Sequence, residues 1–369
     1  MSEQTSESAP DSLTVDSQLF DAARNGDVDG LAVLLDKHPD KLQVRNEPYE
    51  HTLLHVAAFA GHLASVDLLL GHGLDVNARE KGDNTYPMHW AAAAGHVDVV
   101  RRLADAGGDV VGHGDDHELE VIGWAVCWNN SDDAPHRSIV DFLVSRGARH
   151  HIFSAIAMNL ADEVRRIVAA DPAAVSRQMS RNENHQLPLH FAVRMNRPAI
   201  VALLLELGAD PAATDASGVT PAMYAAAPNV DRQVIEALAR HSETDVFTAL
   251  ALGDEATAAR LIGEDPSIIE SGGSSTGVLH LMAKRGDARA VKWLLDRGAN
   301  PNALWSHWDA AVTPLHLAAS QGHADIVDLL LASGADSSIR DTKHDSDAIG
   351  WAEHFGQRDI VRILAAVRR

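Results

Sequence analysis

The chain has 369 residues, of which 46% are hydrophobic and 22% charged, so it has the composition of a folded protein and is long for a single globular core. Its net charge of −21 at pH 7 argues against nucleic acid and anionic membranes as partners, because both are bound by clustered Lys and Arg. The single cysteine, Cys127, excludes an internal disulfide and a cysteine-based zinc site.

The first sixteen residues, MSEQTSESAPDSLTVD, are rich in Ser, Glu and Asp. They lack the basic and apolar regions of a secretion signal, and no apolar run in the sequence is long enough for a membrane span. We therefore predict an acidic disordered tail at 1–16, a cytoplasmic location and no membrane association.

The rest of the chain, 17–369, consists of about eleven similar units, each with two runs of apolar residues at helical spacing. In chain order, their recognisable starts lie near residues 18, 51, 85, 122, 152, 186, 219, 246, 277, 312 and 349. One such helix pair cannot bury its own apolar face, so neighbouring pairs must stack. The pattern predicts an all-α solenoid of stacked helix pairs joined by finger-like loops.

The unit from Val312 shows the signals that bound these helices. Pro314 lies at the start of the first predicted helix, where a missing N–H costs nothing. Gly322 separates the two helices, and Gly334 ends the second one. The second helix contains three consecutive leucines, 329–331, and we expect Leu329 to pack in the stack.

Five units share a start like VTPLHLAASQGHADIVDLLLASGAD. This resembles the ankyrin repeat, with its T-P-L-H-x-A start and a period near 33 residues. The resemblance implies that the motif imidazole bonds to the Thr hydroxyl and to nearby backbone, joining adjacent repeats. The histidines in this structural position are His55, His89, His190, His280 and His316. His62, His96 and His323 follow the inter-helix Gly and have a similar implied role.

Other units depart from this start. Those near 18, 152 and 246 carry a Phe and lack the motif, and they divide the chain into modules of about 17–150, 151–243 and 244–369. The sequence IGWA closes the first and third modules, with Gly123 and Gly350 in the place of the motif His. We expect the lost hydrogen bond to loosen these two units. Trp124 and Trp351 follow, and we expect core packing, with lining of the groove as the alternative.

Candidate ligand-binding histidines lie in the predicted finger loops. They are His51, His117, His185, His307 and His344. Adjacent fingers lie side by side, so these residues would form an acidic, imidazole-lined edge; the alternative is a row of solvated turn residues. No spacing such as H-E-x-x-H occurs, so we predict no metal site and no cofactor. The longer loops at 112–120 and 303–312 stand out, the second because of Trp305 and Trp308.

The ends of the first helices should form a concave face. Candidate contact residues there are Phe59, Trp128, Arg194, His354 and Phe355. The resemblance implies a monomeric, non-catalytic scaffold that binds another protein through this face and the fingers, and the acidic charge favours a basic partner. The alternative is a small-molecule binder or unusual enzyme, with a cavity lined by His117, Trp128, His185, Trp308 and His344.

Overall fold

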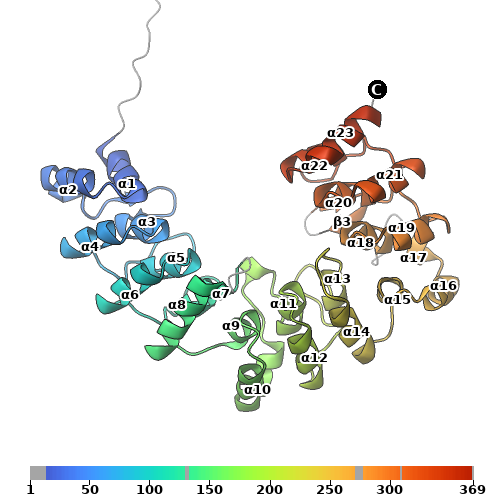
Figure 1. Cartoon of the computed structure of the whole chain (residues 1–369), viewed down its shortest axis with the longest axis horizontal. Coiled ribbons are helices and arrows are strands. Elements are labelled where there is room, and N and C mark those ends of the chain that lie inside the picture. The colour runs from blue at the N-terminus through green and yellow to red at the C-terminus, as the bar shows by residue number, and fades with distance from the viewer. Residues whose placement is uncertain (1–13, 129–132, 271–276, 308–309, 368–369) are drawn as a thin grey trace, which may run out of the picture. The chain divides into compact units, whose positions relative to one another are not determined.

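The structure is a computed structural model that describes residues 14–128, 133–270, 277–307 and 310–367 (Figure 1). The chain is an all-α solenoid of helix pairs, as the two apolar runs per unit predicted. Most of the expected tail, 1–13, lies outside the described residues. Its last two residues, Val15 and Asp16, already belong to the first helix, because Thr14 caps that helix by accepting the N–H of Ser17.

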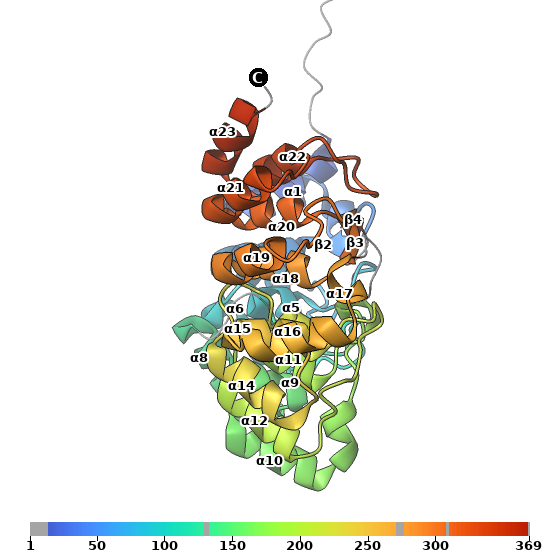
Figure 2. The same ribbon diagram turned by 90° about the vertical axis from the view of Figure 1, so that its right-hand side faces the viewer.

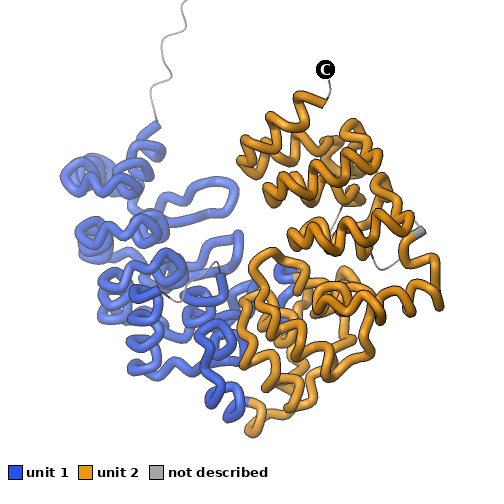
Figure 3. Tube along the Cα trace, turned by 45° about the vertical axis from the view of Figure 1, so that its right-hand side comes forward, with its two compact units in different colours: residues 1–167, 179–183 blue, residues 168–178, 184–369 orange. Residues whose placement is uncertain are grey.

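The chain divides into two compact units (Figure 3). The first unit comprises residues 1–167 and 179–183, and the second comprises 168–178 and 184–369. The division falls within a helix, not at the end of a repeat. The three modules expected from the sequence remain a prediction.

The elements of the first unit are α1 (Val15–Asn25), α2 (Val28–Lys37), η1 (Pro39–Lys41), β1 (Arg45–Asn46), β2 (His51–Thr52), α3 (Leu53–Ala60), α4 (Leu63–Gly71), α5 (Pro87–Ala93), α6 (Val97–Asp105), α7 (Glu120–Val126), α8 (Ala134–Ser145), α9 (Ile152–Ala157) and η3 (Arg181–Glu183). Helix α10 (Ala161–Ala170) contains the division between the units.

The elements of the second unit are η2 (Pro172–Ser176), α11 (Pro188–Arg194), α12 (Pro198–Glu206), α13 (Pro221–Tyr224), α14 (Arg232–His241), α15 (Val246–Leu252), α16 (Glu255–Glu264), α17 (Ser267–Glu270), α18 (Val278–Arg285), α19 (Ala288–Leu295), β3 (Trp305–His307), β4 (Ala310–Val312), α20 (Pro314–Gln321), α21 (Ala324–Ala332), α22 (Ala348–His354) and α23 (Arg358–Val367).

Helix α3 shows why these sequences form short first helices. Thr52 caps its start in a capping box with His55, whose Nδ1 accepts the backbone N–H of Thr52. Gly61 ends the helix at φ +76°, a conformation that favours glycine. A Cβ at Gly61 would also lie 2.5 Å from the ring of His96 in the next repeat, so this glycine serves both the turn and the stacking.

The helices stack in two layers within each unit. In the first unit, α1, α3, α5 and α7 pack in succession, and α2, α4, α6 and α8 form the second layer. In the second unit, α18, α20 and α22 pack in the same way, as Figure 2 shows. The core between the layers consists of fully buried Leu, Ile, Val and Ala side chains, for example Leu54, Leu69 and Leu330.

The motif histidines join one repeat to the next. Their Nε2 atoms contact backbone carbonyl oxygens of the following repeat: His55 with Thr85 at 3.2 Å, His89 with Gly112 at 3.1 Å, His190 with Val219 at 2.9 Å, His280 with Ala303 at 2.8 Å and Val312 at 3.1 Å, and His316 with Ser346 at 3.1 Å. Because Nδ1 accepts an N–H in the capping boxes of His55 and His316, Nε2 is the donor in these rings.

A second set of histidines points back toward the preceding repeat. His62 Nε2 contacts the carbonyl of Arg24 at 3.0 Å, His96 that of Phe59 at 2.9 Å, and His323 that of Lys284 at 3.2 Å. His136 does the same to Ala93 at 3.2 Å, although the sequence pattern did not single it out. Imidazoles therefore join several pairs of neighbouring repeats, some reaching forward along the chain and some reaching back.

Two fingers form short antiparallel hairpins. Strands β1 and β2 pair Arg45 with Thr52, and β3 and β4 pair Trp305 with Val312. The longer loop at 303–312 is thus ordered as a hairpin at the residues the structure describes. Trp308 lies outside the described residues, and the side chain of His307 does too.

Candidate partner-binding surface

Four rings of the first unit lie in contact on the first helices α3 and α5 and the adjoining finger. We call this cluster the first aromatic patch: Tyr49, His51, Phe59 and Trp90. The ring centroids of His51 and Trp90 are 4.4 Å apart, those of Phe59 and Trp90 are 5.6 Å apart, and those of Tyr49 and His51 are 5.7 Å apart. Tyr49 is 53% exposed and Phe59 is 55% exposed, so the patch is open to solvent.

Hydrogen bonds to buried residues hold Trp90 in this patch. Its Nε1 donates to Oγ1 of Thr85 at 2.8 Å, and that hydroxyl donates to Oε1 of Glu80 at 2.7 Å. Glu80 is buried and also accepts the backbone N–H groups of Gly82, Asp83 and Thr85. Burial alone would raise the pKa of Glu80, but these hydrogen bonds outweigh burial and keep the pKa below its ordinary value.

A similar arrangement recurs in three later repeats, in which the aromatic side chain bonds directly to the carboxylate without an intervening hydroxyl. A carboxylate at the base of the finger accepts a hydrogen bond from the aromatic side chain that follows the motif position: Trp124 to Asp115 at 3.0 Å, Tyr224 to Asp215 at 2.8 Å and Trp351 to Asp341 at 2.9 Å. The three carboxylates are buried. Hydrogen bonds from Trp351 and from backbone N–H groups outweigh burial and hold the pKa of Asp341 at about 2.

The two IGWA tryptophans differ in exposure although they make the same kind of hydrogen bond. Trp124 is 9% exposed and buried, whereas Trp351 is half-buried and contributes to an open surface. The unit with Gly123 also keeps an imidazole contact where loosening was expected. His151 Nε2 contacts the carbonyl of Leu119 at 2.9 Å, and a Cβ at position 123 would lie 2.8 Å from that same Nε2. A glycine at 123 thus makes room for an imidazole from the next repeat.

His117 occupies a different position from the exposed finger tip that the sequence suggested. Its Nδ1 contacts the buried carboxylate of Glu183, and its Nε2 lies 3.3 Å from Oδ1 of Asp83. Burial lowers the pKa of His117, but the two carboxylates outweigh burial and raise it above the ordinary value. His117 thus attaches the finger segment 179–183 to the finger that contains Asp83.

Trp128 belongs to this same group. Its ring centroid lies 5.0 Å from that of His117 and 5.4 Å from that of Trp124, and the side chain is half-buried. The structure therefore brings His117 and Trp128 together, and Glu183 completes the group. Glu183 could not be predicted from the sequence, because the contact joins residues 66 positions apart in the chain.

A second aromatic patch lies at the C-terminal end of the second unit and comprises Trp351, His354 and Phe355. The centroids of Trp351 and Phe355 are 6.0 Å apart, and those of His354 and Phe355 are 4.9 Å apart. These side chains and His344 line a cavity of about 380 Å³. His344 and His354 are exposed, and Phe355 is 51% exposed.

The remaining predicted site residues are dispersed over the second unit. Arg194 is exposed, with its guanidinium 4.9 Å from the ring centroid of Phe191. His185 is half-buried in its finger at φ +52°. Trp305 is half-buried, and its ring centroid lies 5.6 Å from that of His280, so it is less exposed than the sequence suggested.

The residues expected to line the cavity of the small-molecule alternative are divided between the two compact units. His117 and Trp128 belong to the first unit, His185 and His344 belong to the second, and Trp308 is not described. Within the described residues, no group of three or more His, Cys, Asp or Glu side chains is arranged to hold a metal ion. No helix in the described ranges is both long and apolar enough to cross a membrane.

Stacked helix pairs with aromatic patches at the ends of their first helices define a helical-repeat protein of the interaction-module class. Family models for ankyrin repeats match residues 19–112, 54–154 and 279–368, and a second such model matches 189–239. The chain belongs to the ankyrin repeat family. Ankyrin repeats are protein-interaction domains, and the fold is typically non-catalytic.

Relatives share the repeats over a limited part of their length. The E3 ubiquitin-protein ligase XB3 of Oryza sativa subsp. japonica is 38% identical over 104 residues, which is 28% of this chain and 22% of that protein. Ankyrin repeat protein nuc-2 of Neurospora crassa is 25% identical over 306 residues, which is 83% of this chain and 23% of that protein. This chain thus spans about a quarter of the length of the curated relatives it matches. The crystal structure of the human ASB11 ankyrin repeat domain is similar at 23% identity and a TM-score of 0.42, covering 62% of this chain and 99% of that chain.

Proposed function

We propose that this chain is a non-catalytic protein-binding module that holds a basic segment of its partner on the first aromatic patch. The observation that carries the proposal is the contact of four rings, two of them more than half exposed, on α3, α5 and the adjoining finger. Contiguous exposed rings of this kind are typical of interaction sites, in which Trp and Tyr supply much of the binding energy.

The charge of the chain supports a basic partner. The net charge is −21 at pH 7. Burial keeps the pKa of His51 below its ordinary value, although the carboxylates of Glu80 and Asp83 act in the opposite direction. A Lys or Arg side chain is attracted to the face of an exposed aromatic ring, by about 0.5–1 kcal/mol at an exposed site. Opposite net charges would also speed the encounter between the proteins.

The rigidity of the patch supports binding without large reorganisation. Trp90 is held by Thr85 and Glu80, and the backbone of the Tyr49 finger is held by Arg45, whose guanidinium donates to the carbonyls of Glu50 and Arg79 at 2.9 and 2.7 Å. A surface formed before the encounter loses little conformational entropy when the partner binds.

The test compares proteins captured from a native lysate by the wild-type chain, by the double variant Tyr49→Ala/Phe59→Ala and by the control Val144→Ala. Val144 is an exposed apolar residue of α8 in the second helix layer. We expect a partner with a basic segment to bind the wild type and the control at low salt and to be lost with the double variant. Capture should also weaken at about 0.5 M salt. Equal capture by all three proteins would refute the role of the patch, and no protein partner at low salt would refute the function.

The same proposal includes a monomeric chain, a cytoplasmic location and no binding to nucleic acid. Size-exclusion chromatography with light scattering, cell fractionation and a gel-shift assay with duplex DNA and RNA would test these three points separately. The acidic net charge supports the last of them, since binding to phosphates relies on Lys and Arg.

A further inference from the structure

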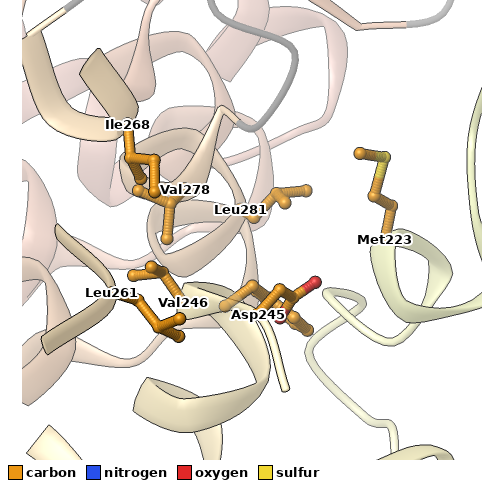
Figure 4. A pocket seen from close by; sticks show the side chains of 8 residues that line it. Met223, Asp245, Val246, Leu261, Ile268, Val278 and Leu281 are labelled. Atoms are coloured by element: carbon orange, nitrogen blue, oxygen red, sulfur yellow. The ribbon is translucent and has the colours of Figure 1, made fainter. Parts of the chain in front are cut away.

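The second unit contains an apolar cavity of about 250 Å³ that the proposed function does not use (Figure 4). In Figure 4, Met223 of α13 lies on one side of this space, and Leu281 of α18 lies on the other with the side chains of α15, α16 and α17. The lining residues are Met223, Asp245, Val246, Phe247, Leu261, Ile268, Val278 and Leu281. The one carboxylate among them, Asp245, accepts the N–H of Thr248 as the cap of α15.

The cavity follows from the sequence of the degenerate repeat near 219. Its first helix, α13, has four residues, whereas α11 has seven and α18 has eight. Pro228 lies four residues after Tyr224. Proline has no N–H to donate within a helix, and its ring disfavours helical backbone at the residue before it. Helix α13 therefore ends early, and the layer of first helices is incomplete beside Met223, which stands in the place of a motif His.

A smaller cavity of about 160 Å³ adjoins the first, because Met223 and Leu281 line both. Its wall carries two cations, Arg194 and Lys284, together with the aromatic rings of Tyr224 and Trp305. The carboxylate in this wall, Asp215, already accepts the Tyr224 hydroxyl at 2.8 Å and the N–H groups of Ser217 and Val219. Positive charge thus faces this end of the site in a chain with a net charge of −21.

Lys284 is the cation best placed to bind an anion. Its side chain rises from the last turn of α18, and burial lowers its pKa to about 8, so its ammonium form is poorly hydrated. A carboxylate beside a poorly hydrated ammonium forms a strong charge-assisted bond, because little water has to be displaced. Arg285, the next residue, donates to the carbonyl of Ala225 at 2.7 Å, and this bond ties α18 to the residue after α13.

We propose that the two adjoining cavities bind a small amphipathic carboxylate, with its apolar tail against Met223 and Leu281 and its carboxylate at Lys284 and Arg194. An apolar cavity of about 150 Å³ can hold benzene, so the larger cavity has room for an aliphatic or aromatic group. Apolar walls with a few charged groups that fix orientation are the usual composition of small-ligand sites. The site lies in the second unit and shares no residue with the first aromatic patch.

The first experiment measures binding of three probes to the full chain by isothermal titration calorimetry. The probes are octanoate, octanol and octyltrimethylammonium, which share the tail and differ in charge. We expect one octanoate per chain, with octanol and octyltrimethylammonium about tenfold or more weaker, because a bond between charged groups contributes that much. Equal binding of all three probes, or no binding of octanoate, would overturn the proposal.

The second experiment uses variants with intact melting curves by circular dichroism. Lys284→Met should weaken octanoate about tenfold and leave octanol unchanged, and Met223→Trp should fill the space and weaken both. The matched control is Lys292→Met, which removes an exposed cation of α19 that pairs with Asp296. If Lys284→Met and Lys292→Met have the same affinity for octanoate, the site is wrongly assigned. Tight binding of an N-acetylated, amidated Glu-Leu-Glu peptide together with no binding of octanoate would instead assign the cavities to a protein segment and overturn the small ligand.

Discussion

The indole Nε1 of Trp124 donates a hydrogen bond of 3.0 Å to Oδ1 of Asp115, and both side chains are buried. The same carboxylate accepts the backbone N–H groups of His117, Leu119 and Glu120, so it joins the turn of the finger to the helix that follows. Because Trp351 and Asp341 repeat this arrangement, the finger and the first helix of these units form one rigid piece.

Replacing this indole should cost stability through the hydrogen bond. Trp124→Phe leaves a buried carboxylate oxygen with one donor fewer, which should lower the free energy of unfolding by about 1–3 kcal/mol more than the loss of packing. The control is Trp293→Phe, because Trp293 is similarly buried and its Nε1 makes no hydrogen bond with the described residues. Urea unfolding of both variants followed by circular dichroism gives the difference. Equal losses for the two variants would contradict a stabilising role of the Trp124 bond.

The second prediction concerns the three consecutive leucines of α21. Leu330 is fully buried, whereas Leu329, expected from the sequence to pack in the stack, is half-buried. Leu330→Ala should therefore cost about 2–5 kcal/mol of unfolding free energy, and Leu329→Ala should cost clearly less. Urea midpoints measure both. A larger loss for Leu329→Ala would show that the helix is rotated from the orientation described here.

These leucines show what the sequence could and could not predict. The helix pairs, their stacking and the motif histidines follow from local spacing, because each unit repeats the same pattern of apolar residues, Pro and Gly. A run of three leucines does not reveal which one faces the core. The rotation of a helix about its axis can be predicted only where polar residues separate the apolar ones. The effect of the short helix α13 could not be predicted from the sequence either, because the cavity that it leaves is visible only once α18 is placed beside it.

The candidate binding surface could be predicted in part from the sequence. Phe59 and Phe355 were expected at the ends of first helices and are exposed there. Tyr49 was missed, because it lies in a finger whose backbone direction the sequence does not give. The finger carboxylates were also missed, although a signal exists: Asp115, Asp215 and Asp341 each precede an aromatic residue by nine or ten positions. His117 was expected at an exposed tip and instead contacts Glu183, which is distant in sequence.

The third prediction is a loss of stability in mild acid caused by the motif histidines. Burial lowers the pKa of His55, His89 and His280 to about 4, against 6.5 for an exposed imidazole. Below pH 6.5 the unfolded chain binds protons that the folded chain does not, so stability falls as the pH drops from 6.5 toward 4. At about pH 5 each residue should cost about 2 kcal/mol relative to neutral pH.

Urea unfolding at about pH 7.5 and about pH 5 measures this acid effect. His280→Gln should reduce the difference between the two pH values, because it removes one titrating group. The control His344→Ala should leave the difference unchanged, since His344 is exposed. If the free energy of unfolding is the same at both pH values, the buried histidines are not the neutral donors that the stacking requires.

The fourth prediction has the opposite sign and concerns His117. Although burial lowers its pKa, contacts with Glu183 and Asp83 raise it above 6.5 in the folded chain. Its stabilising contribution is therefore fully present below pH 6.5 and is lost as the pH rises through the folded pKa. The attachment of segment 179–183 should weaken in that range, because a neutral imidazole binds the two carboxylates less strongly than a protonated one.

Two measurements test this behaviour of His117. Nuclear magnetic resonance of the imidazole should give a midpoint above 6.5, and a midpoint at or below 6.5 would contradict the ion pairing. Trypsin should cleave after Arg181, which lies in the attached segment, faster at about pH 8.5 than at about pH 7 relative to an exposed reference peptide. The variant His117→Gln, which cannot be protonated, should be cleaved at the faster relative rate at both pH values. This variant separates the effect of the charge from any change in the activity of trypsin.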